Sequence, residues 1–309
     1  MTDAASTIEF QRASRWYGPV IALNDVTTTV GPGVTGLLGP NGAGKSTFLK
    51  LCAGQLAPSQ GTVSVLGVPA WGHPELYHRI GLCPEADALW DQLTGEQFLV
   101  ALLRLGGFDE AECTRRAQAA LETVDLVSAR HRRCGGYSRG MRQRLKVAQA
   151  LAHDPQVLLL DEPLSGMDPI NRRRATDLVK RLAREGRTIV VSSHVLHEVE
   201  SMTRRVLLIH NGRILAEGDV REIRDLMDEH PHTVALRARD PRALARAVVG
   251  APHVVSVSFG AEGEWVTVQT ARPDEFYGAL SEPALEAGVL EMYSPDDDLE
   301  SVFRYLVQR

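Results

Sequence analysis

The sequence predicts an α/β fold with a largely parallel sheet, followed by a smaller α+β domain. Between about residues 7 and 220, short apolar runs typical of buried strands alternate with amphipathic stretches typical of helices. That alternation is the pattern of a parallel sheet covered by helices. After about residue 223 the expected order becomes β-α-β-β-α-β, the split arrangement of a ferredoxin-like domain. We therefore expect one domain over 1–222 and a second over 223–309.

Within the first domain, residues 86–150 are expected to form a mostly helical subdomain. Thr94 and Gln97 have the spacing of a capping box, which begins a helix that Gly106 and Gly107 end. A second helix is expected over 109–124. The other elements expected are strands at 34–38, 157–160, 188–192 and 206–209, and helices at 143–152 and 170–184. In the tail we expect strands at 233–237, 254–259, 264–270 and 289–293, and helices at 241–249, 273–280 and 298–307.

Composition and charge narrow the possible functions. The chain has 309 residues and a formal net charge of −5, and an acidic chain repels phosphate backbones, so nucleic acid is not an expected partner. Its four cysteines are scattered without a Cys-x-x-Cys pair, which disfavours a zinc site or a disulfide framework. The first residues do not resemble a signal peptide, and no apolar run is long enough to cross a bilayer. Any role at a membrane would therefore be peripheral.

A glycine-rich segment between the first apolar strand and a helix start is the most informative motif. It fits the phosphate-binding pattern G-x-x-x-x-G-K-[ST] and consists of Gly39, Pro40, Asn41, Gly42, Ala43, Gly44, Lys45 and Ser46. Glycines allow backbone N–H groups to approach phosphate oxygens, and the helix that continues at Thr47 favours an anion at its N-terminus. Lys45 can reach the β- and γ-phosphates, and the Ser46 hydroxyl can hold Mg²⁺.

Two carboxylates follow a second apolar strand. Asp161 and Glu162 end the run that begins at Val157, and α/β sheets bind ligands at the carboxyl edge of their strands. Asp161 suits Mg²⁺, directly or through water. Glu162 is expected to point the other way, because neighbouring strand side chains alternate, and it could act as a general base on water. The alternative is a strand that ends in a solvated acidic turn.

These motifs together make the chain resemble the nucleotide-binding subunit of an ATP-binding-cassette (ABC) transporter. Tyr17 lies where that family places an aromatic residue that stacks on adenine, although it could also be a core tyrosine. The segment from Tyr137 to Gln143 resembles the family signature Leu-Ser-Gly-Gly-Gln. It keeps Ser138 and Gly140, which in the family contact nucleotide on the opposite subunit, but it departs at Tyr137, Arg139 and Met141. Apart from the family resemblance, the Ser-x-Gly segment at Ser138 and Gly140 is simply a helix cap.

Three further positions carry the resemblance. Asp168 follows at the spacing of the family's D-loop, where it would couple two active sites, or it could simply open the next helix at an Asp-Pro turn. His194 ends a strand as the family's switch histidine does, and it could bridge the γ-phosphate and Glu162. A metal pair with His197, or a histidine without function, is the alternative. Glu85 replaces the usual glutamine of the Q-loop, where it could approach Mg²⁺ or remain an ordinary loop acid.

Two apolar residues near the Q-loop and the end of the chain are the parts of the sequence that concern a membrane partner. In the family, the surface beside the Q-loop receives short helices of the membrane partner, so Leu89 and Trp90 could belong to that surface or pack internally. The end of the chain, Leu299 to Phe303, resembles the Leu-Glu-x-Val-Phe ending of bacterial exporter ATPases, or it is an ordinary amphipathic helix.

The resemblance implies a P-loop NTPase fold of the ABC type and a Mg²⁺-dependent ATPase. The resemblance implies that the protein works as a dimer, with a second copy of the chain expected as partner, and that it drives export through a separate transmembrane permease. No association with nucleic acid is expected. The expected location is the cytoplasmic face of a bacterial cell membrane. The alternative is a soluble ABC-type ATPase that is not coupled to transport.

Overall fold

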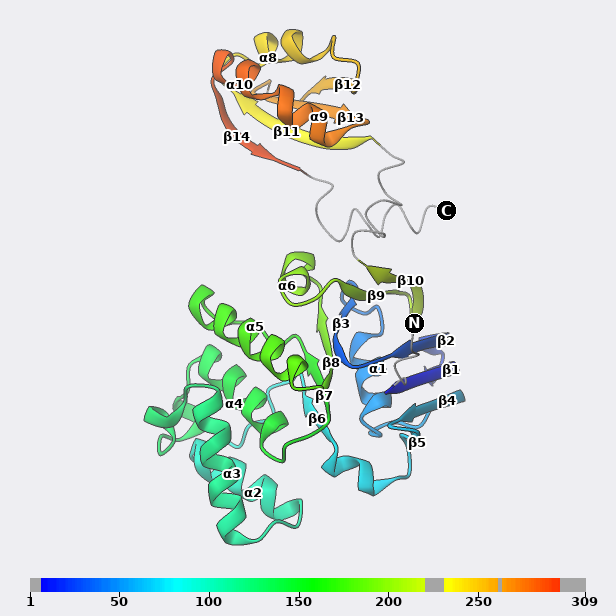
Figure 1. Cartoon of the computed structure of the whole chain (residues 1–309), viewed down its shortest axis with the longest axis vertical. Coiled ribbons are helices and arrows are strands. Elements are labelled where there is room, and N and C mark those ends of the chain that lie inside the picture. Colours follow the sequence, from blue (N-terminus) through cyan, green and yellow to red (C-terminus); the bar gives the residue numbers. More distant parts are fainter. Residues whose placement is uncertain (1–6, 220–230, 261–262, 295–309) are drawn as a thin grey trace. The chain divides into compact units, whose positions relative to one another are not determined.

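The structure, a computed structural model, describes residues 7–219, 231–260 and 263–294. Its contacts divide the chain into two units, Met1–Asp219 and Val220–Arg309, so the division lies three residues before the boundary expected from the sequence. Figure 1 shows the elements of each unit. No helix among the described residues is both long and apolar enough to span a bilayer.

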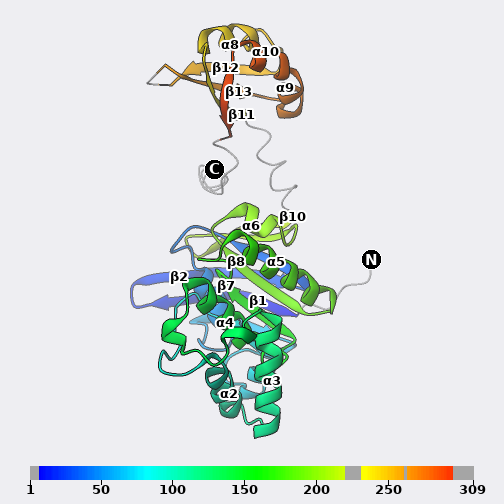
Figure 2. The same cartoon turned by 90° about the vertical axis from the view of Figure 1, so that its left-hand side faces the viewer.

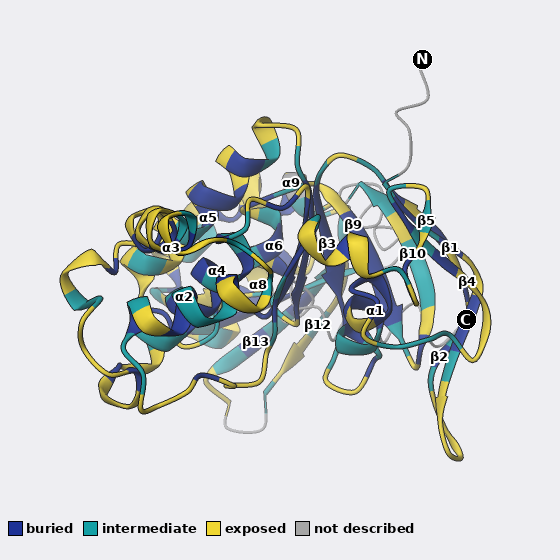
Figure 3. Ribbon diagram, turned by 90° about the horizontal axis from the view of Figure 1, so that it is seen from below, coloured by how far each residue is buried: buried dark blue, intermediate teal, exposed yellow. Residues whose placement is uncertain are grey.

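The first unit is built on a six-stranded sheet in the order β10-β9-β3-β8-β7-β6. Neighbouring strands from β9 to β6 run parallel, and β10 is antiparallel to β9. The strands are β3 (Gly33–Leu38), β6 (Ile80–Cys83), β7 (Val157–Asp161), β8 (Thr188–Ser193), β9 (Arg205–His210) and β10 (Arg213–Asp219). β7 and β8 are buried along their whole length, which fits the near-continuous apolar runs that mark strands covered on both faces. β3 and β9 of the same sheet are mostly buried too, as the dark blue colour shows in Figure 3.

A second, antiparallel sheet of the first unit was not expected from the sequence. It has the order β2-β1-β4-β5 and comprises β1 (Ile8–Tyr17), β2 (Val20–Val30), β4 (Gln60–Val65) and β5 (Val68–Pro69). Helix α1 (Lys45–Cys52) contacts strands of both sheets, and the Phe48 ring stacks on that of Phe10 with 4.2 Å between centroids. The phosphate loop therefore begins a helix that is packed between two sheets.

The helical subdomain contains α2 (Gly95–Leu105), α3 (Glu110–Thr123) and α4 (Arg139–Leu151), with short 3₁₀ turns η2 (Val127–Ala129) and η3 (Cys134–Gly136). A further 3₁₀ turn, η1 (Pro74–His78), precedes β6. The predicted capping box at the start of α2 is present: the Thr94 side chain accepts from the Gln97 N–H, and the Gln97 side chain accepts from the Thr94 N–H. After β7 the chain forms α5 (Pro169–Arg184), and α6 (Leu196–Glu200) follows β8.

The second unit has a four-stranded antiparallel sheet in the order β12-β13-β11-β14. Its elements are β11 (His232–Ala238), α8 (Pro241–Val248), β12 (Val254–Phe259), β13 (Trp265–Thr270), α9 (Pro273–Ala279), α10 (Ser281–Glu286) and β14 (Val289–Tyr293). Alternate residues of β11 and β13 pack with Leu244 and Phe276 of the helices, which cover one face of this sheet (Figure 2). Helix α10 was not expected, and the helix expected at 298–307 lies outside the described residues.

All four cysteines are free and buried. Burial raises the pKa of Cys83 to about 12, so this thiol stays protonated at neutral pH. Its position in β6 is a packing position.

Candidate functional site

The phosphate loop joins the end of β3 to the start of α1. Gly44 has a φ of 112°, and a Cβ atom there would lie 2.5 Å from the Ala22 carbonyl oxygen, so only glycine fits. The buried Lys45 ammonium donates to the Gly39 carbonyl at 2.6 Å and to the Pro40 carbonyl at 3.3 Å. The lysine side chain therefore folds back over the loop that it follows.

A hollow of about 300 Å³ lies over this loop. Its lining comprises Pro40, Asn41, Gly42, Ala43, Gly44, Lys45, Ser46 and Thr47, together with Ala22, Glu85 and Glu162. The fold thus brings two acids distant in sequence, Glu85 and Glu162, to the same hollow as the loop. Seven of the eight residues of the predicted motif, all but Gly39, line the hollow, so it has the form of a polyphosphate site.

Glu162 is the best-anchored acid of the site. Its carboxylate oxygen Oε1 lies 3.0 Å from Nδ1 of His194 and 3.6 Å from Nζ of Lys45. An ionised carboxylate only accepts hydrogen bonds, so a hydrogen bond to the Glu162 carboxylate requires the His194 tautomer that has its proton on Nδ1. The predicted proximity of His194 and Glu162 is therefore present, with the Glu162 side chain buried and that of His194 about half exposed.

The prediction that strand alternation turns the Glu162 side chain away from that of Asp161 is wrong. Glu162 lies after the end of β7 and has a φ of 49°, so strand alternation does not set its direction. The Ser192 hydroxyl instead links the two acids: it donates to Asp161 and accepts from the Glu162 N–H at 3.0 Å. Gln143 of α4 fixes Glu162 further by donating to its carbonyl oxygen at 3.2 Å. Asp161 itself is buried and does not line the hollow.

Sequence reasoning missed Ser192 and Gln143. Ser192 is one of two serines that directly precede His194 at the end of β8, so a polar strand end was the available signal. Gln143 lies one turn into α4, and no sequence pattern pairs it with Glu162, which is 19 positions away.

Glu85 is exposed and lies two residues after the end of β6. Its loop is held by α4 at two points: Lys146 donates to the carbonyl oxygens of Pro84 and Glu85, at 2.9 and 2.7 Å, and Arg142 pairs with Asp87 and Asp91. Leu89 of the same loop is buried, which supports internal packing. Trp90 is about half exposed and meets the Phe98 ring edge to face, with 5.6 Å between centroids.

The ion pair between Asp87 and Arg142 makes stability depend on pH. Hydrogen bonds from the Arg142 guanidinium hold the pKa of Asp87 below its usual value. The stabilisation is therefore present above the unfolded pKa of about 3.9 and is lost as the pH falls through the lower folded value. Because Asp87 is exposed, Asp87→Asn is expected to lower Tm by only about 1–3 °C at pH 7. Thermal unfolding at pH 7 and at low pH measures this change in Tm. Asp177→Asn, on the exposed face of α5, is the control. A Tm difference that persists at low pH would contradict it.

Besides Gly39, Asp161 and His194, four further residues predicted for the site do not line the hollow. Tyr17 lies at the end of β1 and is 43% exposed, which excludes a core tyrosine, and the Arg15 guanidinium lies 5.1 Å from its ring centroid. Ser138 caps α4 by accepting from the Met141 N–H at 3.3 Å, and Gly140 lies in the first turn of that helix. Asp168 caps α5, and the N–H groups of Asn171 lower its pKa. Both capping interpretations are thus correct as local structure.

The alternative of a metal pair at His194 and His197 has no support. Among the residues that the structure describes, no group of three or more His, Cys, Asp or Glu side chains could hold a metal ion.

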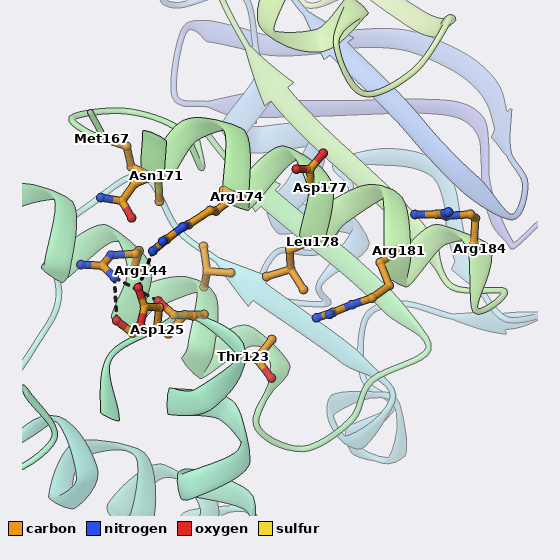
Figure 4. A pocket seen from close by; sticks show the side chains of 13 residues that line it. Thr123, Asp125, Arg144, Met167, Asn171, Arg174, Asp177, Leu178, Arg181 and Arg184 are labelled. Carbon is orange, nitrogen blue, oxygen red and sulfur yellow. Dashed lines mark hydrogen bonds and ion pairs between the residues drawn. The ribbon is translucent and has the colours of Figure 1, made fainter. Parts of the chain in front are cut away.

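A larger cavity of about 490 Å³ lies between the end of α3, α4 and α5 (Figure 4). Arg144 donates there to the carbonyl oxygens of Val124 and Asp125, and Arg174 pairs with the Asp125 carboxylate. None of the phosphate-loop residues lines this cavity, so its size does not make it the nucleotide site.

Comparisons with known proteins agree with the geometry of the phosphate-loop site. Residues 23–165 match the family model described as ABC transporter. The Nod factor export ATP-binding protein I of Rhizobium etli is 32% identical over 308 residues, which cover 98% of this chain and 94% of that protein. The chain belongs to the ABC transporter family. It is an ATP-binding subunit of this family, and its reaction is the hydrolysis of ATP.

Other relatives and solved structures fit this membership. The doxorubicin resistance ATP-binding protein DrrA of Mycobacterium tuberculosis is 37% identical, over 72% of this chain and 68% of that protein. A solved ATP-binding subunit of an ABC transporter superposes with a TM-score of 0.65 at 30% identity and covers 72% of this chain and 93% of its own. A bacterial ABC transporter cassette, solved as a dimer, has the same TM-score at 23% identity, over 69% of this chain and 99% of its own, and shows the shared fold.

Proposed function

We propose that this ABC ATPase powers export through a separate transmembrane permease, by an ATP-dependent dimerisation of its ATP-binding subunits. The observation that carries the catalytic part is the position of Glu162. Its carboxylate lies between the Lys45 ammonium and the His194 imidazole, at the wall of the phosphate-loop hollow. An acid held there can take a proton from a water molecule that attacks the terminal phosphate.

The residues around the loop fit a magnesium ion. Mg²⁺ prefers oxygen ligands and is usually held by one or two protein groups and the substrate phosphates, not by a cage of protein ligands. Ser46 and Glu85 offer oxygens at the hollow, and Asp161 offers a carboxylate behind it. When bound, the ion would neutralise charge on the phosphates. We assign Ser46 and Asp161 to hold it, with Glu85 directly or through water.

Each residue of the proposed site has a defined part in this mechanism. Backbone N–H groups of the loop bind the phosphates, and Lys45 moves its ammonium contact from the loop carbonyls to the β- and γ-phosphates. Glu162 orients and deprotonates water, while His194 holds the Glu162 carboxylate and contacts the γ-phosphate. Tyr17, exposed at the end of β1, is assigned to stack on adenine.

A second copy of the chain would complete the nucleotide site. Ser138, Gly140 and Asp168 lie on exposed or half-exposed helix starts and do not line the hollow of their own subunit. The N-terminus of α4 offers N–H groups that suit an anion. We therefore propose a head-to-tail dimer in which Ser138 and Gly140 of one subunit contact ATP on the other. The contact is formed with the γ-phosphate and lost on hydrolysis.

Export is favoured by a relative that matches this chain over nearly its whole length. Its match to the Nod factor export ATP-binding protein spans 98% of this chain and thus includes the second unit. A relative named for doxorubicin resistance points the same way. We propose a peripheral location on the cytoplasmic face of a bacterial membrane, with the permease as a separate chain.

Co-expression tests this function. The chain is expressed with the multi-span protein encoded beside its gene, and we expect the two to co-purify in detergent and to hydrolyse ATP. In vesicles, we expect ATP-dependent movement of a solute out of the compartment that the ATPase faces. Association with ribosomes or DNA, and none with a membrane protein, would instead indicate an ABC ATPase that is not coupled to transport.

A further inference from the structure

Lys146 is a buried cation in the middle of α4. Only 4% of the residue is exposed, and its ammonium donates to two successive backbone carbonyls, those of Pro84 and Glu85. A buried ammonium is costly unless its donors are satisfied, so the Lys146 side chain and the loop backbone hold each other in one arrangement. These two bonds use two of its three donors.

The two carbonyls lie at the start of the loop that carries Glu85. Because they face α4, the backbone at this point is fixed while the Glu85 side chain remains exposed and lines the phosphate-loop hollow. The loop has a second attachment to α4 at Arg142, one turn before Lys146, but that attachment holds Asp87 and Asp91. Lys146 is thus the contact that acts on Glu85 itself.

The same helix also holds the other acid of the hollow. Gln143, three positions before Lys146 and therefore on the same face of α4, donates to the carbonyl oxygen of Glu162. One helix face consequently sets the backbone of both Glu85 and Glu162, and that helix starts at Ser138. A shift of α4 along its axis would move both acids relative to the phosphate loop.

We infer that Lys146 is a positioning residue of the ATPase. Its ammonium keeps the Glu85 carboxylate at the phosphate-loop hollow and thereby sets how strongly Mg²⁺ strengthens the binding of ATP. Lys146 does not line the hollow, so it acts through the loop backbone. This inference rests on the proposed magnesium role of Glu85. It also gives a structural basis for the glutamate that this chain has where the family usually has glutamine.

The test measures ATP affinity with Mg²⁺ and with EDTA by titration calorimetry, in full-length protein that carries Glu162→Gln so that ATP is not consumed. Lys146→Met is expected to weaken Mg²⁺-supported affinity about tenfold and to leave the affinity in EDTA unchanged. Lys146→Arg keeps a donor cation and is expected to restore most of the loss. Lys180→Met removes an exposed lysine of α5 and is the matched control.

A double-mutant cycle separates positioning from general damage. In a Glu85→Gln background, Lys146→Met is expected to have less than about a twofold further effect, because the carboxylate that it positions is gone. The inference would be overturned if Lys146→Met weakened ATP affinity equally in Mg²⁺ and in EDTA. It would also be overturned if Lys146→Met weakened Mg²⁺-supported affinity by the same factor with and without Glu85→Gln. Thermal unfolding identifies a variant that does not fold, and Lys146→Gln, which keeps an N–H donor without the charge, then takes the place of Lys146→Met. Failure of the proposed function is seen separately, as absence of Mg²⁺-dependent ATP hydrolysis by the unaltered chain.

Discussion

Glu162→Gln is expected to reduce ATP turnover by about a hundredfold or more, while ATP binding is retained. Glutamine has nearly the same shape, and its amide oxygen can still accept from Nδ1 of His194, which lies 3.0 Å from the Glu162 carboxylate. The amide cannot take a proton from water at neutral pH, so the step that cleaves the terminal phosphate loses its base. Because the γ-phosphate would persist, we also expect closed dimer to accumulate in ATP.

Steady-state ATPase assays, ATP titration and size-exclusion chromatography measure these three effects. Glu185→Gln is a matched control, since it makes the same chemical change at an exposed residue that follows α5. The control should hydrolyse ATP at the normal rate. Undiminished turnover by Glu162→Gln would remove this residue from the catalytic role assigned to it.

Lys45→Ala is expected to weaken ATP binding at least about tenfold and to abolish hydrolysis. The buried ammonium is the one charge that the phosphate loop directs at the phosphates from within its own sequence. Its present partners are the carbonyls of Gly39 and Pro40 and the Glu162 carboxylate. Removing it leaves the negative charge of the triphosphate facing Glu162 and Glu85 without this cation, so repulsion adds to the lost hydrogen bonds.

Lys50→Ala provides the comparison for Lys45→Ala. Lys50 lies in the same helix but is exposed, so its loss tests whether any lysine of α1 supports binding. Calorimetry with Mg²⁺ and ATP should give normal affinity for Lys50→Ala and a strongly reduced affinity for Lys45→Ala. Thermal unfolding of both variants checks that the helix is intact. Normal ATPase activity in Lys45→Ala would contradict the assignment of the site.

Local sequence was sufficient for features that depend on neighbouring residues. The phosphate loop, the capping box at Thr94 and Gln97 and the caps at Ser138 and Asp168 each bond within a few positions, so their patterns are readable without the fold. The strand before the loop and the strand before Asp161 were also expected, because apolar runs of that length mark buried strands. The antiparallel sheet β2-β1-β4-β5 was missed, because its strands pair across distances that no local pattern records.

What the sequence by itself determined, then, is the set of chemical groups and the short elements that carry them. Only the tertiary structure decided how those groups meet: β3, β6, β7 and β8 lie in one sheet, and their ends bring Lys45, Glu85, Glu162 and His194 together. It also decided the left-handed backbone of Glu162, the link through Ser192 and the hold of α4 on the loop of Glu85. The physical reason is that these contacts join residues tens of positions apart, and such contacts depend on how the chain packs, not on which residues are neighbours along it.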